Sequence, residues 1–91
     1  MRISEFKRVE FVDTMPEKKE FGVLYVSKRF SLVICQCPCG CGMEAVMPIK
    51  PKSYGWAYSE KDGKVTLSPS VAVDCPNKAH FFVRDNKIEW V

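Results

Sequence analysis

The sequence predicts an all-β fold, built as a small and mostly antiparallel sheet that is curled or doubled into a sandwich. Apolar residues recur in short segments with the two-residue period of a half-buried strand, as in Phe6 to Val12, where Val9 and Phe11 share a face. Turn signals separate these segments, among them Asp62-Gly63, a dipeptide typical of β-hairpins. No segment has a convincing helical pattern, so the class is all-β.

Short connections join the expected strands along the chain. Pro48 and Pro51 interrupt the pattern, so Lys50 to Gly55 is expected to be a loop. The 91 residues are enough for one hydrophobic core, and we expect a single domain over residues 1–91. The segments expected to be strands are Phe6 to Val12, Phe21 to Val26, Phe30 to Ile34, Met43 to Ile49, Trp56 to Ser59, Val65 to Leu67, Ser70 to Val73, Phe81 to Arg84 and Ile88 to Val91.

Cysteines and the single histidine mark a metal site. Four cysteines stand at alternate positions within the connection between two expected strands, and Cys75 and His80 follow near the C-terminal end. Thiolates and imidazole are the ligands that Zn²⁺ prefers, and a structural zinc takes four of them in a tetrahedron. The sequence therefore predicts one zinc ion held by four of the five residues Cys37, Cys39, Cys41, Cys75 and His80.

The alternating cysteines offer more thiols than one zinc needs from this side. Cys37 precedes a proline and Cys41 precedes a glycine, a pattern typical of a metal knuckle whose backbone amides turn toward sulfur. The favoured set is therefore Cys37, Cys41, Cys75 and His80. Cys39 is expected to be a substitute ligand or a neighbouring thiol. Cys35 follows an apolar strand and is expected to be a packed, inert thiol.

Disulfides are the alternative use of these cysteines. The count of five is odd, and residues two apart on a strand lie roughly 6.5–7 Å apart, too far to bridge. Charged residues fill the N-terminal segment where a secretion signal needs an apolar stretch, and no segment has the roughly 18 apolar residues of a membrane span. We therefore expect reduced thiols, no membrane association and a location in the cytoplasm.

The charge distribution argues against nucleic acid as a partner. The net charge is only +3, and basic residues are interleaved with acidic ones, so no basic stripe marks a nucleic-acid footprint. A zinc-ribbon-like nucleic-acid binder is the least favoured class.

Two kinds of hydrolytic chemistry are open from the residues alone. Catalysis at zinc needs an open coordination position and a general base, for which Glu44 is the nearest acid in sequence. Ser68 and Ser70 are possible nucleophiles, but serines beside a proline are more often turn residues, and His80 cannot serve as their base if it binds zinc. A zinc-stabilised protein-interaction module without catalysis is the alternative.

One combination of motifs resembles a known family. The run Cys37-Pro-Cys-Gly-Cys-Gly42, then Thr66-Leu-Ser-Pro-Ser-Val71, then Cys75 with His80-Phe81, is similar to a small bacterial and phage domain family of unknown function over roughly residues 30–91. Members lie beside ubiquitin-like proteins and their conjugating enzymes in operons and are regarded as peptidases. The resemblance implies a zinc-dependent peptidase whose partner is a ubiquitin-like protein or its C-terminal tail.

Overall fold

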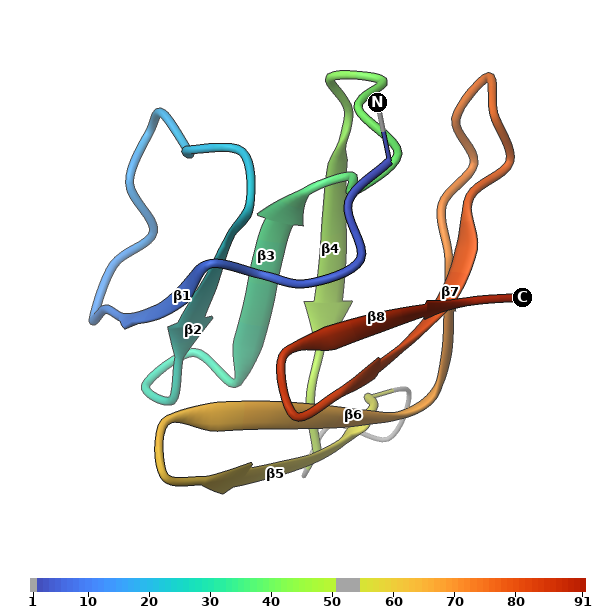
Figure 1. The fold of residues 1–91 in the computed structure, drawn as a ribbon. Coiled ribbons are helices and arrows are strands. Elements are labelled where there is room, and N and C mark those ends of the chain that lie inside the picture. Colours follow the sequence, from blue (N-terminus) through green and yellow to red (C-terminus); the bar gives the residue numbers. More distant parts are fainter. Residues whose placement is uncertain (1, 51–54) are drawn as a thin grey trace.

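The computed structural model describes residues 2–50 and 55–91, and within them the chain forms eight β-strands and no helix (Figure 1). The all-β class predicted from the sequence is confirmed. No helix in the described part is long and apolar enough to span a membrane. The strands are β1 (Arg8–Phe11), β2 (Val23–Ser27), β3 (Leu32–Gln36), β4 (Glu44–Pro48), β5 (Ala57–Lys61), β6 (Lys64–Ala72), β7 (His80–Arg84) and β8 (Lys87–Trp90).

The first sheet has the strand order β1-β2-β3-β4. Its pairs are antiparallel except for β1 and β2, which run parallel because a long connection returns the chain before β2 begins. Every residue of β2 is buried, as its sequence Val-Leu-Tyr-Val-Ser allows. A strand that is apolar on both faces occupies the interior of a sheet.

The second sheet is fully antiparallel, with the order β5-β6-β7-β8. Asp62 and Gly63 connect β5 to β6, and Asp85 and Asn86 connect β7 to β8; all four residues have positive φ. Positive φ at both central residues is the requirement of the tight hairpin turn whose twist matches that of the strands. Asn86 also accepts a hydrogen bond from the Val65 amide through Oδ1, at 2.8 Å, which ties the second turn to β6.

Strand β6 differs from the expectation of two separate segments. It runs without interruption from Lys64 to Ala72, but its register with β7 shifts between Leu67 and Val71. Pro69 lies inside this irregular stretch, after a cis peptide bond. Since proline has no amide hydrogen to donate to the ladder, a β-bulge is where a sheet tolerates it. The expected loop from Lys50 to Gly55 falls largely on residues 51–54, which lie outside the described residues.

The two sheets share one hydrophobic core. β2, β3 and β4 contribute one side of it, and β6, β7 and β8 contribute the other. The two sheets lie across one another with their apolar faces in contact (Figure 1). The larger side chains that are fully buried in this core are Leu24, Val26, Val33, Met47, Val65, Leu67, Val71, Phe81 and Val83.

Phe81 is the largest fully buried side chain, and its ring packs against Trp90 at a centroid distance of 5.4 Å. Phe81→Ala is expected to lower the free energy of unfolding by about 3–5 kcal/mol, because the ring's contacts are lost and a cavity remains. Urea denaturation followed by fluorescence measures this. Phe11→Ala is the matched control: Phe11 in β1 is 47% exposed, so the loss should stay below about 1 kcal/mol. Equal losses for the two variants would contradict the assigned core.

Candidate functional site

The alternating cysteines lie in the connection between β3 and β4. The Cys37 amide donates to the Met43 carbonyl at 2.7 Å, and the Gly40 amide donates to the Cys37 carbonyl at 3.0 Å. Gly40 and Gly42 both have positive φ, of 86° and 90°, which residues with a side chain rarely adopt. The glycines therefore allow a tight hairpin loop in which successive cysteines turn toward one point.

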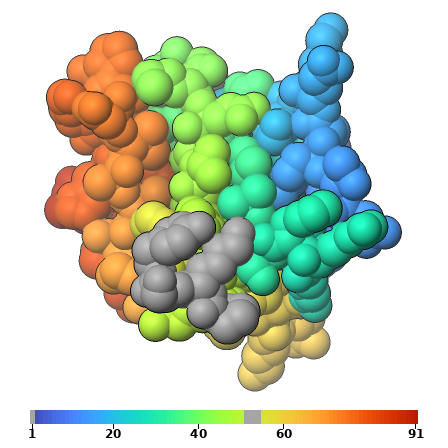
Figure 2. Space-filling model, turned by 180° about the vertical axis from the view of Figure 1, so that it is seen from behind, coloured from blue at the N-terminus to red at the C-terminus, as the bar shows by residue number. Residues whose placement is uncertain are grey.

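A second loop brings Cys75 to the same point. It joins β6 to β7 and is closed by hydrogen bonds from the Val73 amide to the Ala79 carbonyl, at 2.8 Å, and from the Lys78 amide to the Cys75 carbonyl, at 2.9 Å. The loop lies beside the cysteine hairpin at one end of the molecule, where the orange and green segments meet in Figure 2. Cys75 is buried in this contact.

Four sulfurs meet between these two loops. The Sγ atoms of the cysteine cluster, which consists of Cys37, Cys39, Cys41 and Cys75, all lie within 4.8 Å of one another. None of these four cysteines forms a disulfide, and the Sγ–Sγ distances are 3.3 Å from Cys37 to Cys39 and 3.8 Å from Cys39 to Cys75. Sulfurs at the corners of a tetrahedron around zinc stand about 3.8 Å apart, given bonds of about 2.3 Å. The cysteine cluster could therefore hold a metal ion.

The surroundings of two of the four sulfurs, those of Cys39 and Cys75, favour the deprotonated form that binds metals. Burial alone would raise the pKa of Cys39, but hydrogen bonds from Asn77 and from neighbouring thiols outweigh it and lower that pKa to about 6. Asn77 donates Nδ2–H to Cys39 Sγ at 3.4 Å. The backbone amides of Ala79 and Asn77 lower the pKa of Cys75 in the same way. Burial dominates at Cys37, where it raises the pKa. Amides directed at sulfur are the knuckle arrangement that the sequence predicts.

The cysteine cluster differs from the favoured ligand set at one position. Cys39 stands in the group where His80 was expected. His80 instead lies at the start of β7 and pairs in register with Ala72 of β6. Its Nε2 atom is 2.8 Å from Ser70 Oγ, a hydrogen bond between two groups of known catalytic use. The only imidazole of the chain is thus engaged with a hydroxyl.

Ser70 and His80 lie on the outer face of the second sheet. His80 and Phe82 alternate with the buried Phe81 and Val83, and Ser70 stands in the bulge of β6 on the same face as His80. His80 is exposed and Ser70 is half-buried, so this pair is open to a large substrate. Among the described residues, no hydrogen bond joins His80 to a carboxylate. Ser70 and His80 therefore form a pair, called the dyad below, and not a triad.

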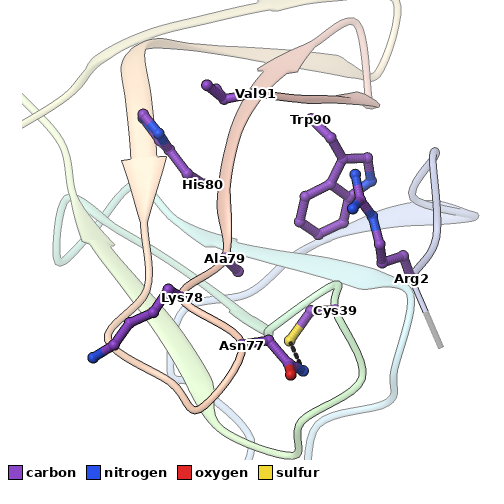
Figure 3. Close-up of a pocket in the computed structure, with 8 residues that line it drawn as sticks. All are labelled: Arg2, Cys39, Asn77, Lys78, Ala79, His80, Trp90 and Val91. Atoms are coloured by element: carbon purple, nitrogen blue, oxygen red, sulfur yellow. Dashed lines mark hydrogen bonds between the residues drawn. The ribbon is translucent and has the colours of Figure 1, made fainter.

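The loop of Cys75 connects the cysteine cluster to this dyad. Figure 3 shows the segment from Asn77 to His80 running from Cys39 to the base of β7, with the His80 ring turned away from Arg2 and Trp90. A cavity of about 500 Å³ lies along this segment, and a second of about 360 Å³ is lined by Lys78, His80 and Asp74 among others. Only four residues lie between Cys75 and His80, so the position of the Cys75 sulfur constrains the position of the His80 side chain.

The structure places the remaining predicted residues outside both groups. Glu44 begins β4 and forms an ion pair with Lys19, with 3.0 Å between Oε2 and Nζ. Ser68 is exposed, two residues before Ser70. Cys35 is fully buried in β3, where burial, together with the negative charge of Glu44, raises the pKa of its thiol to about 12. This environment is that of an inert thiol.

A family comparison adds to this geometry. The model of a family described as bacterial ubiquitination-like system serine protease (BubE) matches residues 11–91. The chain belongs to this family. The predicted resemblance to a family from bacterial ubiquitin-like systems is thereby confirmed. The comparisons with curated proteins and with solved structures gave no significant match.

Sequence reasoning did not pair Ser70 with His80. It assigned His80 to the metal, which left the serine without a base. The available signal was the Ser68-Pro69-Ser70 run inside an otherwise regular β segment. Proline in such a place indicates a bulge, and bulges are frequent next to active sites, where they re-aim a side chain.

Removing one sulfur from the cysteine cluster tests its role. Cys75→Ser is expected to abolish stoichiometric metal binding and to cost about 3 kcal/mol or more, because structural metal sites contribute roughly 10 kcal/mol or more to folding. That loss corresponds to a melting temperature lower by roughly 12–24 °C. Elemental analysis and thermal unfolding measure the two effects. The control, Cys35→Ala, should keep its metal and lose about 1 kcal/mol. Loss of metal from the control would mean that the cluster is wrongly assigned.

Proposed function

We propose that this protein is a serine protease in which Ser70 is the nucleophile and His80 is the general base. The 2.8 Å hydrogen bond between Ser70 Oγ and His80 Nε2 carries this proposal. A serine hydroxyl is a weak nucleophile, and a base within about 2.6–3.2 Å is the arrangement that activates it. The family description, which names a serine protease, supports the same reaction class.

The chemistry follows from the two side chains. Ser70 Oγ attacks the carbonyl carbon of the scissile bond while its proton passes to His80 Nε2, giving a tetrahedral oxyanion. Collapse of this species breaks the bond to the leaving amine, which takes the proton from His80 and leaves an acyl ester on Ser70. Water then attacks the ester and gives a proton to His80. The acyl group departs as an acid, and the hydroxyl regains its proton.

Strand pairing and the preceding loop position the His80 imidazole, a role that a third catalytic side chain has in a triad. The Val91 amide donates to the His80 carbonyl at 3.0 Å, and Ala72 lies opposite on the other side. His80 therefore has strand neighbours on both sides. In the resting state, Nε2 must accept the serine proton, so the ring hydrogen belongs on Nδ1.

We further propose a bacterial ubiquitin-like protein as the substrate, cleaved at its C-terminal tail or at a bond formed through that tail. The family's place in a ubiquitination-like system supports this partner. The exposed dyad also suits a protein tail. Cavities lie along the sheet on either side of it, one near Ala72 and Lys78 and a smaller one, of about 230 Å³, near Ser68 and Phe82. An extended chain crossing the dyad passes both.

Zinc is the metal we assign to the cysteine cluster, in a structural role. Four thiolates complete a tetrahedron, and such a site has no open position at which water is activated. When bound, zinc supplies a rigid cross-link between the β3–β4 hairpin and the loop that leads to His80. Activity depends on zinc in this scheme because the cross-link positions the base, and Glu44 has no catalytic part. A cytoplasmic location suits the reduced thiols.

Ser70→Ala tests the nucleophile. Cleavage of a ubiquitin-like protein that carries a C-terminal extension should fall on the order of 10³-fold or more, because the attacking oxygen is gone. Gel analysis of the product measures the rate. Ser68→Ala, two residues away and exposed, should retain activity within about threefold. Labelling with a fluorophosphonate probe should place the adduct on the peptide that contains Ser70.

The outcomes separate the candidate functions. His80→Ala should lose cleavage and keep its zinc, whereas a ligand role for His80 would remove both. If Ser68→Ala loses cleavage and Ser70→Ala retains it, the nucleophile is Ser68. If the wild-type protein binds the ubiquitin-like protein and neither cleaves it nor reacts with the probe, the chain is an interaction module.

Metal replacement separates a structural zinc from a catalytic one. Protein reconstituted with Cd²⁺ or Co²⁺ should cleave within about threefold of the zinc form, since a metal with four protein ligands does not touch the substrate. Chelation should abolish activity together with the folded structure, which circular dichroism monitors. A rate or pH profile that changes with the metal, while the fold is kept, would contradict the structural assignment.

A further inference from the structure

Trp56 links the first sheet to the bulge that carries Ser70. It lies directly before β5 of the second sheet, but its backbone is bonded to the end of β4. The Trp56 amide donates to the Pro48 carbonyl at 2.8 Å, and the Lys50 amide donates to the Trp56 carbonyl at 2.9 Å. A parallel bridge to Ile49 results. The backbone of Trp56 is therefore fixed to the first sheet.

Gly55 makes this close approach possible. A Cβ atom built on Gly55 would lie 2.5 Å from the Ile49 carbonyl carbon and 2.8 Å from the Lys50 nitrogen. Both are backbone atoms, so they cannot move aside as the end of a flexible side chain can. Any other residue at position 55 would push the chain away from β4, and Trp56 would move with it.

The indole of Trp56 reaches from this anchor to the nucleophile. Its Nε1–H donates to the backbone carbonyl of Ser70 at 3.1 Å. The ring is half-buried and packs against the hydrophobic core, which limits its rotation. Ser70 stands where the register between β6 and β7 shifts, so the regular ladder does not fix this stretch of backbone.

We propose that Trp56 is a positioning residue for Ser70, an inference that rests on the proposed protease function. Its indole holds the Ser70 peptide group against the first sheet and so fixes the direction in which Oγ points toward His80. The cysteine cluster fixes His80 through the Cys75 loop. The two halves of the dyad are thus held separately, and losing either anchor misaligns the pair.

The experiment removes only the indole hydrogen-bond donor. Site-specific incorporation of β-(3-benzothienyl)alanine at position 56 keeps the bicyclic shape and replaces N–H by sulfur. The matched control places the same amino acid at position 90, because the Trp90 indole donates in a similar way to the Ile3 carbonyl, at 2.9 Å. Trp56→Phe is the simpler second variant.

The readout is the rate constant for reaction with a fluorophosphonate probe, in which the Ser70 oxygen–phosphorus bond forms, fluoride leaves and His80 accepts the proton. The variant at position 56 should react roughly five- to tenfold more slowly, the factor that one hydrogen bond contributes. Melting temperature and zinc content should match those of the control. Turnover of the ubiquitin-like substrate should fall in kcat, with KM unchanged.

Three results would overturn the inference, and they are distinguishable. If Ser70→Ala abolishes labelling but the variant at position 56 reacts at the wild-type rate, Trp56 does not position the nucleophile and the protease proposal stands. If Ser70→Ala is labelled as fast as the wild type, both proposals fail. An equal slowing of the variant at position 56 and the control at position 90 would also reject a specific role for Trp56.

Discussion

The convergence of four cysteine sulfurs is the constraint on which the rest of this structure depends. Cys39 and Cys75 are 36 residues apart in the chain and 3.8 Å apart at their sulfurs. Joining segments so distant restricts the unfolded chain strongly, which is why metal binding and folding are coupled in small domains. With Zn²⁺ bound, four thiolates retain two negative charges. The amides and the Asn77 side chain directed at the sulfurs offset that charge.

The position of the cysteine cluster in the fold has a chemical consequence. The loop that carries Cys75 ends at His80, so a metal ion held by the cysteine cluster would define the position of an imidazole that is itself exposed. Ser70 is held from another direction, through the Trp56 indole. Both supports begin next to β4. The cysteine hairpin lies directly before this strand, and the bridge between Ile49 and Trp56 lies directly after it. Since an error of about 1 Å between reacting groups can cost roughly 100-fold in rate, such support is valuable in a small chain.

The single histidine explains why a metal and a serine mechanism compete in the sequence. One imidazole nitrogen cannot both bind zinc and accept the proton of a serine. Four thiols within reach of one another remove the need for a fourth ligand from elsewhere, which frees His80 for Ser70. Cys39 is therefore the residue that connects the two sites. Its inclusion in the cysteine cluster leaves His80 available as the base of the proposed mechanism.

Local features were set by the sequence alone. The two-residue period of Val9 and Phe11, the Asp62-Gly63 turn, and the glycines that let the cysteine loop bend each depend on neighbouring residues, and the strands and hairpins follow from them. The same holds for the buried Cys35, whose apolar strand predicted an inert thiol.

Only the tertiary structure decided which distant groups meet. The parallel pairing of β1 with β2, the bulge in β6 and the grouping of Cys39, rather than His80, with the other sulfurs depend on register between segments far apart in the chain. Thiol and imidazole are equally acceptable to zinc, so ligand chemistry does not choose between them. A serine acquires a base only when a second strand brings one within hydrogen-bond distance, and that distance exists in the folded chain alone.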